Sequence, residues 1–248
     1  MASISETGHA KNVALFDELI SFVSGFGEAY NPSKASISLP GLRTLANNAK
    51  SAINAVNGAY PVYSNAVAAR EAAFTPLSKL VTRIMNALKA TDTTEQVDKS
   101  ARTLIRKIQG TRATPKMTEE ERQAAIAEGK EITEISTSQL SFDSRLENFN
   151  KLIQLLATVS LYTPNEEDLK VASLTALYTD LKAKNTAVTE SSVLLANARI
   201  SRNDVLYKTN TGILDIAADT KNYIKSVYGP SSPQFKQVSK LAFKPIKM

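Results

Sequence analysis

The sequence contains no cysteine and no tryptophan, and it has a single histidine, His9. Without cysteine the chain forms no disulfide and offers no thiolate as a metal ligand or nucleophile. With one histidine, a zinc or di-iron site built on histidines is excluded, and a Ser-His-Asp triad would have to use His9. Because His9 lies in a polar N-terminal segment, we expect it to be disordered and to have no catalytic role.

Glycine and proline are scarce as well, with 9 residues of each among 248. Helices can therefore run far without a break, since these two residues weaken a helix most. Hydrophobic residues make up 43% of the chain and charged residues 22%, which is typical of a globular protein with a buried core. The composition argues against intrinsic disorder.

Long hydrophobic runs are also missing. The most apolar stretch, residues 152–162, contains polar residues and is too short to span a bilayer. The N-terminus has no apolar run behind a basic cluster, so it does not read as a secretory signal. We therefore expect a cytoplasmic protein with no integral membrane segment, with non-classical export left open.

Motifs for catalysis are absent too. The pair Gly129-Lys130 has neither the upstream glycines nor the following Ser or Thr of a phosphate-binding loop. Neighbouring carboxylates such as Asp17-Glu18 fall at expected exposed helix positions, where they favour solubility rather than acid-base chemistry. We expect no enzyme activity, no cofactor and no metal.

An internal duplication organises the chain. When the sequence is shifted by 132 residues, residues 30–70 match residues 162–202 with ten identities in 41 positions. A one-residue deletion extends the match upstream, so that Phe16 falls on Phe149. The identical pairs are Tyr30/Tyr162, Pro32/Pro164, Leu42/Leu174, Leu45/Leu177, Lys50/Lys182, Ala55/Ala187, Val56/Val188, Asn65/Asn197, Ala66/Ala198 and Arg70/Arg202.

Each copy predicts the same helical unit. Apolar residues recur at steps of three and four in residues 12–30 and 144–162, which predicts a first helix with one buried stripe in each copy. A proline turn follows, and then a long helical region. We expect breaks near residues 75–76 and 208–212, with a further weak point at residues 57–61.

This pattern predicts an all-α fold, an elongated antiparallel helical bundle built from two tandem, pseudo-symmetric repeats that cover each other's apolar flanks. The first repeat spans residues 1–110 and the second spans residues 141–248, packed together as one bundle. Residues 111–140 form a charged linker, in which residues 118–128 predict a short acidic helix.

Two polar positions keep their spacing of five in both copies, Asn65 with Arg70 and Asn197 with Arg202. They are either a repeated partner contact or polar anchors that tie one helix to another. We favour the anchors, because a duplication preserves whatever holds the shared fold.

The net charge of +6 is unevenly placed, since residues 99–116 and 221–248 each hold six basic residues and no acid. Such blocks are usually solvated faces and only sometimes binding patches. The C-terminal block interleaves apolar and basic residues. It either docks on a partner, a membrane surface or RNA, or packs on the bundle as a strap with its lysines outward. The candidate interaction residues are Arg102, Arg106, Lys107, Arg112, Lys116, Phe235, Lys236, Lys240, Phe243 and Lys244.

The chain resembles a family of uncharacterised bacterial all-helical proteins. The resemblance is carried by residues 74–80, 83–89, 108–116 and 227–238. The resemblance covers the whole chain. It implies a helical fold and brings no activity with it.

Three functions remain. The first is a non-enzymatic structural or protein-interaction bundle that self-assembles or binds a protein partner. The second is a nucleic-acid-associated or ribosome-associated basic protein that uses residues 99–116 and 221–248. The third, a membrane-active helical protein, has no strongly apolar hairpin in its favour.

Overall fold

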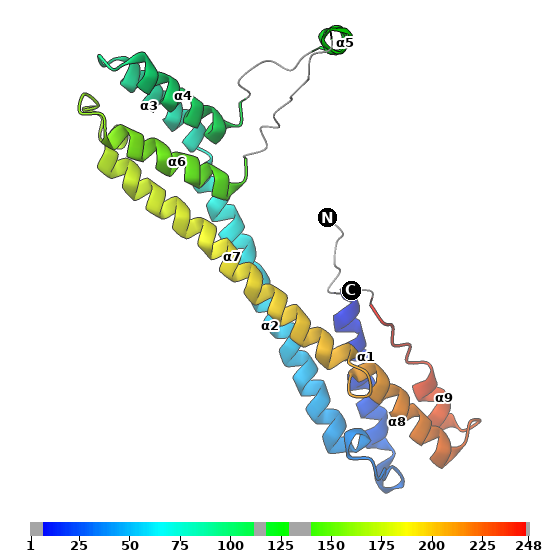
Figure 1. The fold of residues 1–248 in the computed structure, drawn as a ribbon. Helices are drawn as coiled ribbons and strands as arrows, with labels where there is room; N and C mark the ends of the chain where they lie inside the picture. The colour runs from blue at the N-terminus through cyan, green and yellow to red at the C-terminus, as the bar shows by residue number, and fades with distance from the viewer. Residues whose placement is uncertain (1–6, 112–117, 129–139, 247–248) are drawn as a thin grey trace. The chain divides into compact units, whose positions relative to one another are not determined.

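The computed structural model describes residues 7–111, 118–128 and 140–246, and within these ranges it contains helices and no strand (Figure 1). The all-α class is confirmed, as is a helix within residues 118–128. The helices are α1 (Thr7–Gly25), α2 (Leu39–Phe74), α3 (Leu77–Lys89), α4 (Glu95–Gln109), α5 (Glu119–Ala127), α6 (Phe142–Ala157), α7 (Val171–Tyr207), α8 (Ile213–Tyr228) and α9 (Pro233–Ser239), with short 3-10 turns at Gly27–Ala29, Ala35–Ile37 and Glu167–Leu169.

The N-terminal helix begins earlier than its apolar stripe indicates. His9 lies inside α1 with only 2% of its surface exposed, so the expectation of a disordered histidine is wrong. Its Nδ1 lies 2.7 Å from the hydroxyl of Tyr207 at the end of α7. The Nδ2 of Asn12 lies 3.3 Å from the same hydroxyl. Contacts with a residue far away in the sequence therefore order this segment. The polar composition of the segment itself does not predict these contacts.

The long helices end where the sequence indicates, with one exception. Thr75 and Pro76 separate α2 from α3, and the predicted break at residues 208–212 separates α7 from α8. At that break Asn210 has a φ of 67°, and the amide of Gly212 donates to the carbonyl of Lys208 at 2.7 Å. The weak point at residues 57–61 is not a break, because α2 continues through Pro61, which deprives the helix of one amide donor.

The chain divides into two compact units, and each unit draws on both predicted repeats. Unit 1 consists of Met1–Ser64 together with Ser191–Met248, and unit 2 consists of Asn65–Glu190. Unit 2 is thus a continuous segment inserted into unit 1. The helices α2 and α7 are each divided between the two.

Unit 1 has a core of its own, formed by α1, α8, α9 and the parts of α2 and α7 that belong to the unit. In it α8 packs against α1 and α9. The apolar stripe of α1 is buried there, and Phe16 and Leu19 are fully inaccessible to solvent. Burial of one such side chain contributes about 1.5–3 kcal/mol to folding. Across this core, α1 meets residues about two hundred positions further along the chain.

Unit 2 has a separate core, in which α6 packs against α4 and α4 packs against α3. Phe149 of α6 is fully buried, and Phe74 at the end of α2 is 1% exposed. The rings of Phe74 and Phe142 meet edge to face with their centroids 4.9 Å apart, a favoured aromatic geometry. This core, too, joins residues from both repeats.

Each unit contains a buried tyrosine in the turn after a helix, after α1 in unit 1 and after α6 in unit 2. The hydroxyl of Tyr30 donates to the carbonyl of Ile37 at 2.6 Å, and that of Tyr162 donates to the carbonyl of Leu169 at 3.0 Å. Burial raises the pKa of both tyrosines to about 12. The two bonds occupy matching positions in the shifted sequences.

Raising the pH from about 10 to about 12 should destabilise both units, because an unfolded tyrosine has a pKa near 10 and releases its proton first. The stabilisation is complete below pH 10 and is lost as the pH rises through the folded pKa of about 12. A Tyr30→Phe/Tyr162→Phe variant should lose about 1 kcal/mol per hydrogen bond at pH 8. In the natural chain, the free energy of unfolding should fall by about 1–3 kcal/mol per tyrosine between pH 8 and 12, and the double variant should lack this fall. Urea unfolding across this pH range measures both effects. Tyr60→Phe, at a 54% exposed site, is the control. An unchanged pH dependence in the double variant would contradict the assignment.

Candidate interaction surfaces

The first basic segment lies mostly on α4. One face of this helix buries Ala101, Ile105 and Ile108, while Arg102 and Lys107 are exposed and Arg106 is half-buried. The exposed side also carries acid, because Glu95 and Asp98 stand in the first turn and Glu95 pairs with Lys99 at 2.9 Å. The surface of α4 is therefore of mixed sign. The candidates Arg112 and Lys116 lie outside the described residues.

The second basic segment ends in a strap, residues 233–246, which comprises α9 and the chain that follows it. Val238 is fully buried and Leu241 is 5% exposed in the core of unit 1. The side chain of Asn12 fixes the end of the strap, donating to the carbonyl of Lys244 at 2.8 Å and accepting from its amide at 3.2 Å. The strap thus closes over α1 and α8.

The two aromatic residues of the strap are turned inward. Phe235 and Phe243 are half-buried and pack against the core of unit 1. The Nζ of Lys225 lies 5.7 Å from the centroid of the Phe235 ring, and that of Lys221 lies 5.0 Å from the Phe243 centroid. Lys221 also donates to the carbonyl of Leu241, and partial burial lowers its pKa. These contacts hold the strap in place, and they bring a lysine of α8 close to each of its two aromatic rings.

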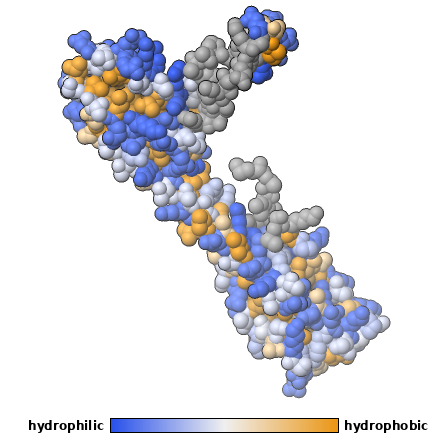
Figure 2. Space-filling view, viewed as in Figure 1, coloured by the Kyte–Doolittle hydropathy of each residue, from blue (hydrophilic) through white to orange (hydrophobic). Residues whose placement is uncertain are grey.

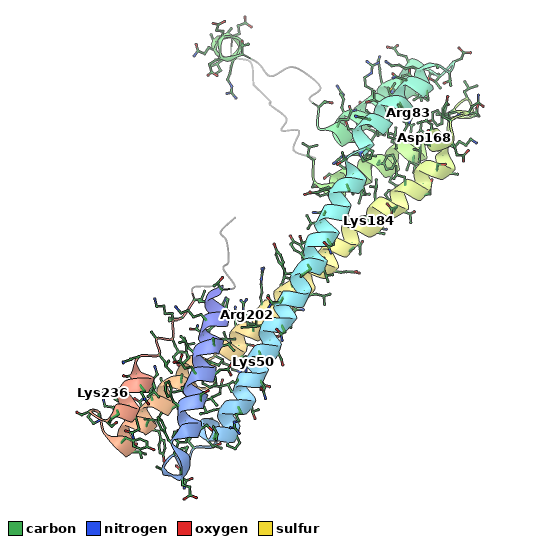
Figure 3. The ribbon with its side chains drawn as sticks, turned by 180° about the vertical axis from the view of Figure 1, so that it is seen from behind. Lys50, Arg83, Asp168, Lys184, Arg202 and Lys236 are labelled. Carbon is green, nitrogen blue, oxygen red and sulfur yellow. The ribbon has the colours of Figure 1, made fainter. Side chains whose placement is uncertain are left out.

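The remaining lysines of the strap face solvent. Lys236, Lys240 and Lys244 are exposed, and Lys236 extends outward from α9 (Figure 3). The packing matches the strap with outward lysines, one of the two arrangements considered for this segment.

In unit 2, Arg70 belongs to a network that joins three helices. Its Nη1 donates to Asn185 Oδ1 of α7 at 3.0 Å, and the amide of Asn185 donates to Asp143 of α6 at 2.7 Å. The Arg70 guanidinium also lies 3.9 Å from the centroid of the Phe142 ring. The contacts of Arg70 are those of an anchor between helices.

Arg145 of α6 completes this network at the end of α2. It donates to the carbonyl of Phe74 at 3.2 Å, which is one of the carbonyls that a helix terminus leaves without a partner in the helix. Partial burial lowers the pKa of Arg145. The predicted duplication does not reveal this residue, because the matching position in the shifted sequence is Asn12, which instead contacts the strap.

The other repeated polar positions lie in different surroundings. Arg202 is 3% exposed, and its Nε and Nη2 donate to Asn203 Oδ1 at 3.1 and 2.8 Å. Asn65 and Asn197 are both exposed on their helices. The arginines are therefore packed into their units, whereas the two asparagines face solvent.

Unit 2 also contains a shallow cavity of about 530 Å³ between α3 and the turn that joins α6 to α7. Arg83 and Asp168 form a bidentate ion pair beside it, and the Nη2–Oδ1 distance is 3.1 Å (Figure 3). Their hydrogen bonds raise the pKa of Arg83 and lower that of Asp168. The lining residues are Arg83, Asn86, Ala87, Ala90, Thr91, Leu161, Tyr162, Thr163, Pro164, Asn165, Glu166 and Leu169.

Unit 1 exposes large apolar side chains on its two long helices. Val193, Leu194 and Ile200 of α7 are 52%, 61% and 59% exposed, and Tyr60 and Val62 of α2 are 54% and 55% exposed. Hydrophobic residues are visible at the surface over the middle of these helices (Figure 2). Residues 51–64 and 191–198 contain no Asp, Glu, Lys or Arg, and Glu190 and Arg199 border the second of these segments.

Among the residues that the structure describes, no three His, Asp or Glu side chains are grouped so that they could hold a metal ion. Within the same ranges, no helix combines the length and the apolar character needed to cross a membrane. Comparison of the chain with protein-family models, curated proteins and solved structures finds no match.

Proposed function

We propose that the chain is a non-enzymatic helical interaction protein of the cytoplasm, made of two tandem copies of one module, which self-associates through the middle of α7. The matching hydrogen bonds of Tyr30 and Tyr162 support the duplication, because each reaches a carbonyl seven residues further along the chain. Phe16 and Phe149, which also match, are both completely buried.

The observation that carries self-association is the exposed apolar stripe of α7. Val193 and Ile200 are seven residues apart, so they lie on the same side of the helix two turns from each other. Asn197 lies between them on that side and is exposed. Large apolar side chains around a polar side chain that can hydrogen-bond are typical of the centre of an interface.

Charge favours a second copy of the chain as the occupant of this stripe. The protein carries a net charge of +6, so two copies repel each other through their net charges. When a two-fold interface forms, each surface meets its own image, and a neutral face avoids like-charge contacts. Residues 191–198, which include Val193, Leu194 and Asn197, contain no charged side chain and provide such a face, with Ile200 at its edge.

A Val193→Lys/Ile200→Lys variant should be monomeric under conditions in which the natural chain forms dimers. Each apolar side chain that loses its burial weakens an interface by about 1.5–3 kcal/mol, and 1.4 kcal/mol corresponds to a tenfold change in affinity. We therefore expect the dissociation constant to rise by at least about a hundredfold, measured by sedimentation equilibrium over a range of concentrations.

The matched control is Thr179→Lys/Thr186→Lys, which adds the same charge at the same spacing on exposed positions of α7 in unit 2. It should leave the dissociation constant within a few fold of that of the natural chain. A natural chain that remains monomeric at high micromolar concentration would refute self-association. Equal effects of the two variants would show that net charge, and not the stripe, governs assembly.

A further inference from the structure

The outer face of the strap is an unopposed cationic surface. Residues 221–248 contain six lysines and no acid. In unit 1, described carboxylates pair with Lys34 and Lys50, but none forms an ion pair with Lys236, Lys240 or Lys244. These three ammonium groups are therefore available to an anionic partner.

The strap also fixes the spacing of its charges. Lys236 lies in α9, and Lys240 caps that helix with helical backbone angles. At a rise of 1.5 Å per residue the two Cα atoms are about 6 Å apart along the axis and on the same side. One strand of a duplex carries a phosphate for about every 3.4 Å of its axis, so two lysines this close together can both contact phosphates of the same strand. The backbone of Lys244, held by Asn12, places a third charge further along.

The same packing decides which anion fits. A single-stranded nucleic acid is held largely by base stacking on aromatic rings, and a membrane surface by apolar side chains that enter the bilayer. Phe235 and Phe243 are half-buried with their rings packed against the core, and Val238 and Leu241 are buried, so the strap offers its partner charge rather than a platform for stacking. A surface of lysines without rings suits the regular phosphates of a duplex.

We infer that the outer face of the strap binds the phosphate backbone of double-stranded nucleic acid without reading its sequence. This function is separate from self-association, which uses α7. Three phosphate contacts give a slope of about −2.7 in a plot of log affinity against log salt concentration. Affinity should then fall by about fortyfold between 50 and 200 mM salt.

The test is fluorescence anisotropy of the full chain with a labelled 30-base-pair DNA duplex between 25 and 200 mM KCl. A Lys236→Gln/Lys240→Gln/Lys244→Gln variant should bind at least tenfold more weakly at 50 mM KCl, with a slope shallower by about 2.7. The control, Lys99→Gln/Lys151→Gln/Lys184→Gln, removes three surface lysines that pair with acids in unit 2. It makes the same change in net charge and should leave affinity and slope nearly unchanged.

Further arms separate the alternative partners. A second duplex of unrelated sequence should bind equally well, whereas a single strand of equal length and vesicles containing phosphatidylserine should bind more weakly. The inference is overturned if the natural chain does not bind the duplex at 25 mM KCl, or if the vesicles are preferred. It is also overturned if the strap and control variants lose affinity equally, or if only Arg102→Gln/Arg106→Gln/Lys107→Gln loses it. Val193→Lys/Ile200→Lys should keep duplex binding, which separates this inference from the proposed self-association.

Discussion

Phe16→Ala and Phe149→Ala should each lower the free energy of unfolding by about 3–5 kcal/mol, because each leaves a cavity where a completely buried ring now packs. A domain is typically stable by about 5–15 kcal/mol, so either change removes a large share of the stability of its unit. Urea unfolding followed by circular dichroism measures the loss. Phe22→Ala, at a half-buried position of α1, should have a smaller effect than Phe16→Ala.

The same two variants test how the units are composed. With Phe16→Ala, amide hydrogen exchange should accelerate in α1, α8 and α9, because these helices share the core of unit 1. With Phe149→Ala it should accelerate in α3, α4 and α6, while α8 and α9 stay protected. If Phe16→Ala instead loosened α3 and α4 and spared α8, each repeat would form a unit by itself and the described division would be wrong.

Shortening the inner side chains of the strap should have a comparably large effect. A Val238→Ala/Leu241→Ala variant should be less stable by about 4–7 kcal/mol, since both side chains lie in the core of unit 1. The N-terminal part of α1 should also lose exchange protection, because Asn12 hydrogen-bonds to the chain three residues beyond Leu241. Thermal unfolding and hydrogen exchange measure the two effects.

The outer side chains of the strap supply the control. Lys236→Gln/Lys240→Gln/Lys244→Gln changes exposed residues only and should shift stability by less than about 0.5 kcal/mol per residue. If Val238→Ala/Leu241→Ala were as stable as the natural chain, the strap would not be part of the core. An unstable outer variant would show that the strap lysines contribute to the fold.

Local patterns predicted the apolar stripe of α1 and α6 and the breaks that end α2 and α7, because those features depend on residues close together in the sequence, but the separation of α3 from α4 was not predicted. The step of three and four in α1 and α6, and the interruption before α8, are such features. The surroundings of His9 could not be predicted in this way, since its partner Tyr207 is 198 residues away. Nor could the continuity of α2 through Pro61, because proline is tolerated or not according to its local context.

The largest feature that the hydrophobic pattern could not predict is which helices make up each unit. Two copies with similar stripes can in principle pack within a repeat or across repeats, and hydrophobic periodicity does not distinguish the two. One pair of contacts does. Lys34 pairs with Asp219 in unit 1, and Arg83 pairs with Asp168 in unit 2. When the later helices are aligned with a gap, Arg83 and Asp219 occupy matching positions. This position therefore carries a positive charge in the first copy and a negative charge in the second.

Packing within each repeat would therefore bring like charges together. Lys34 would approach Arg83, and Asp168 would approach Asp219. Exposed ion pairs contribute at most about 1 kcal/mol, so these contacts bias the choice rather than drive it. The reversal still provides a physical reason for the observed arrangement that a comparison of the two copies alone does not reveal.

Site prediction had a similar limit. The lysines of the strap and the repeated arginines could be selected from charge runs and from the duplication. The inward orientation of Phe235 and Phe243 could not, because an alternation of apolar and basic residues does not say which face is covered. Arg145 and Asn185 gave no signal either, since neither is repeated in the other copy.

The insertion of unit 2 into unit 1 has a consequence during synthesis on the ribosome. Unit 2 can be completed once Glu190 has emerged, whereas unit 1 also needs the strap, residues 233–246. At a translation rate of about 5–20 residues per second, the apolar stripe of α1 stays exposed for about ten seconds or longer. Helix α1 is thus synthesised long before the helices that it packs against, and nascent α1 is where a chaperone would be needed.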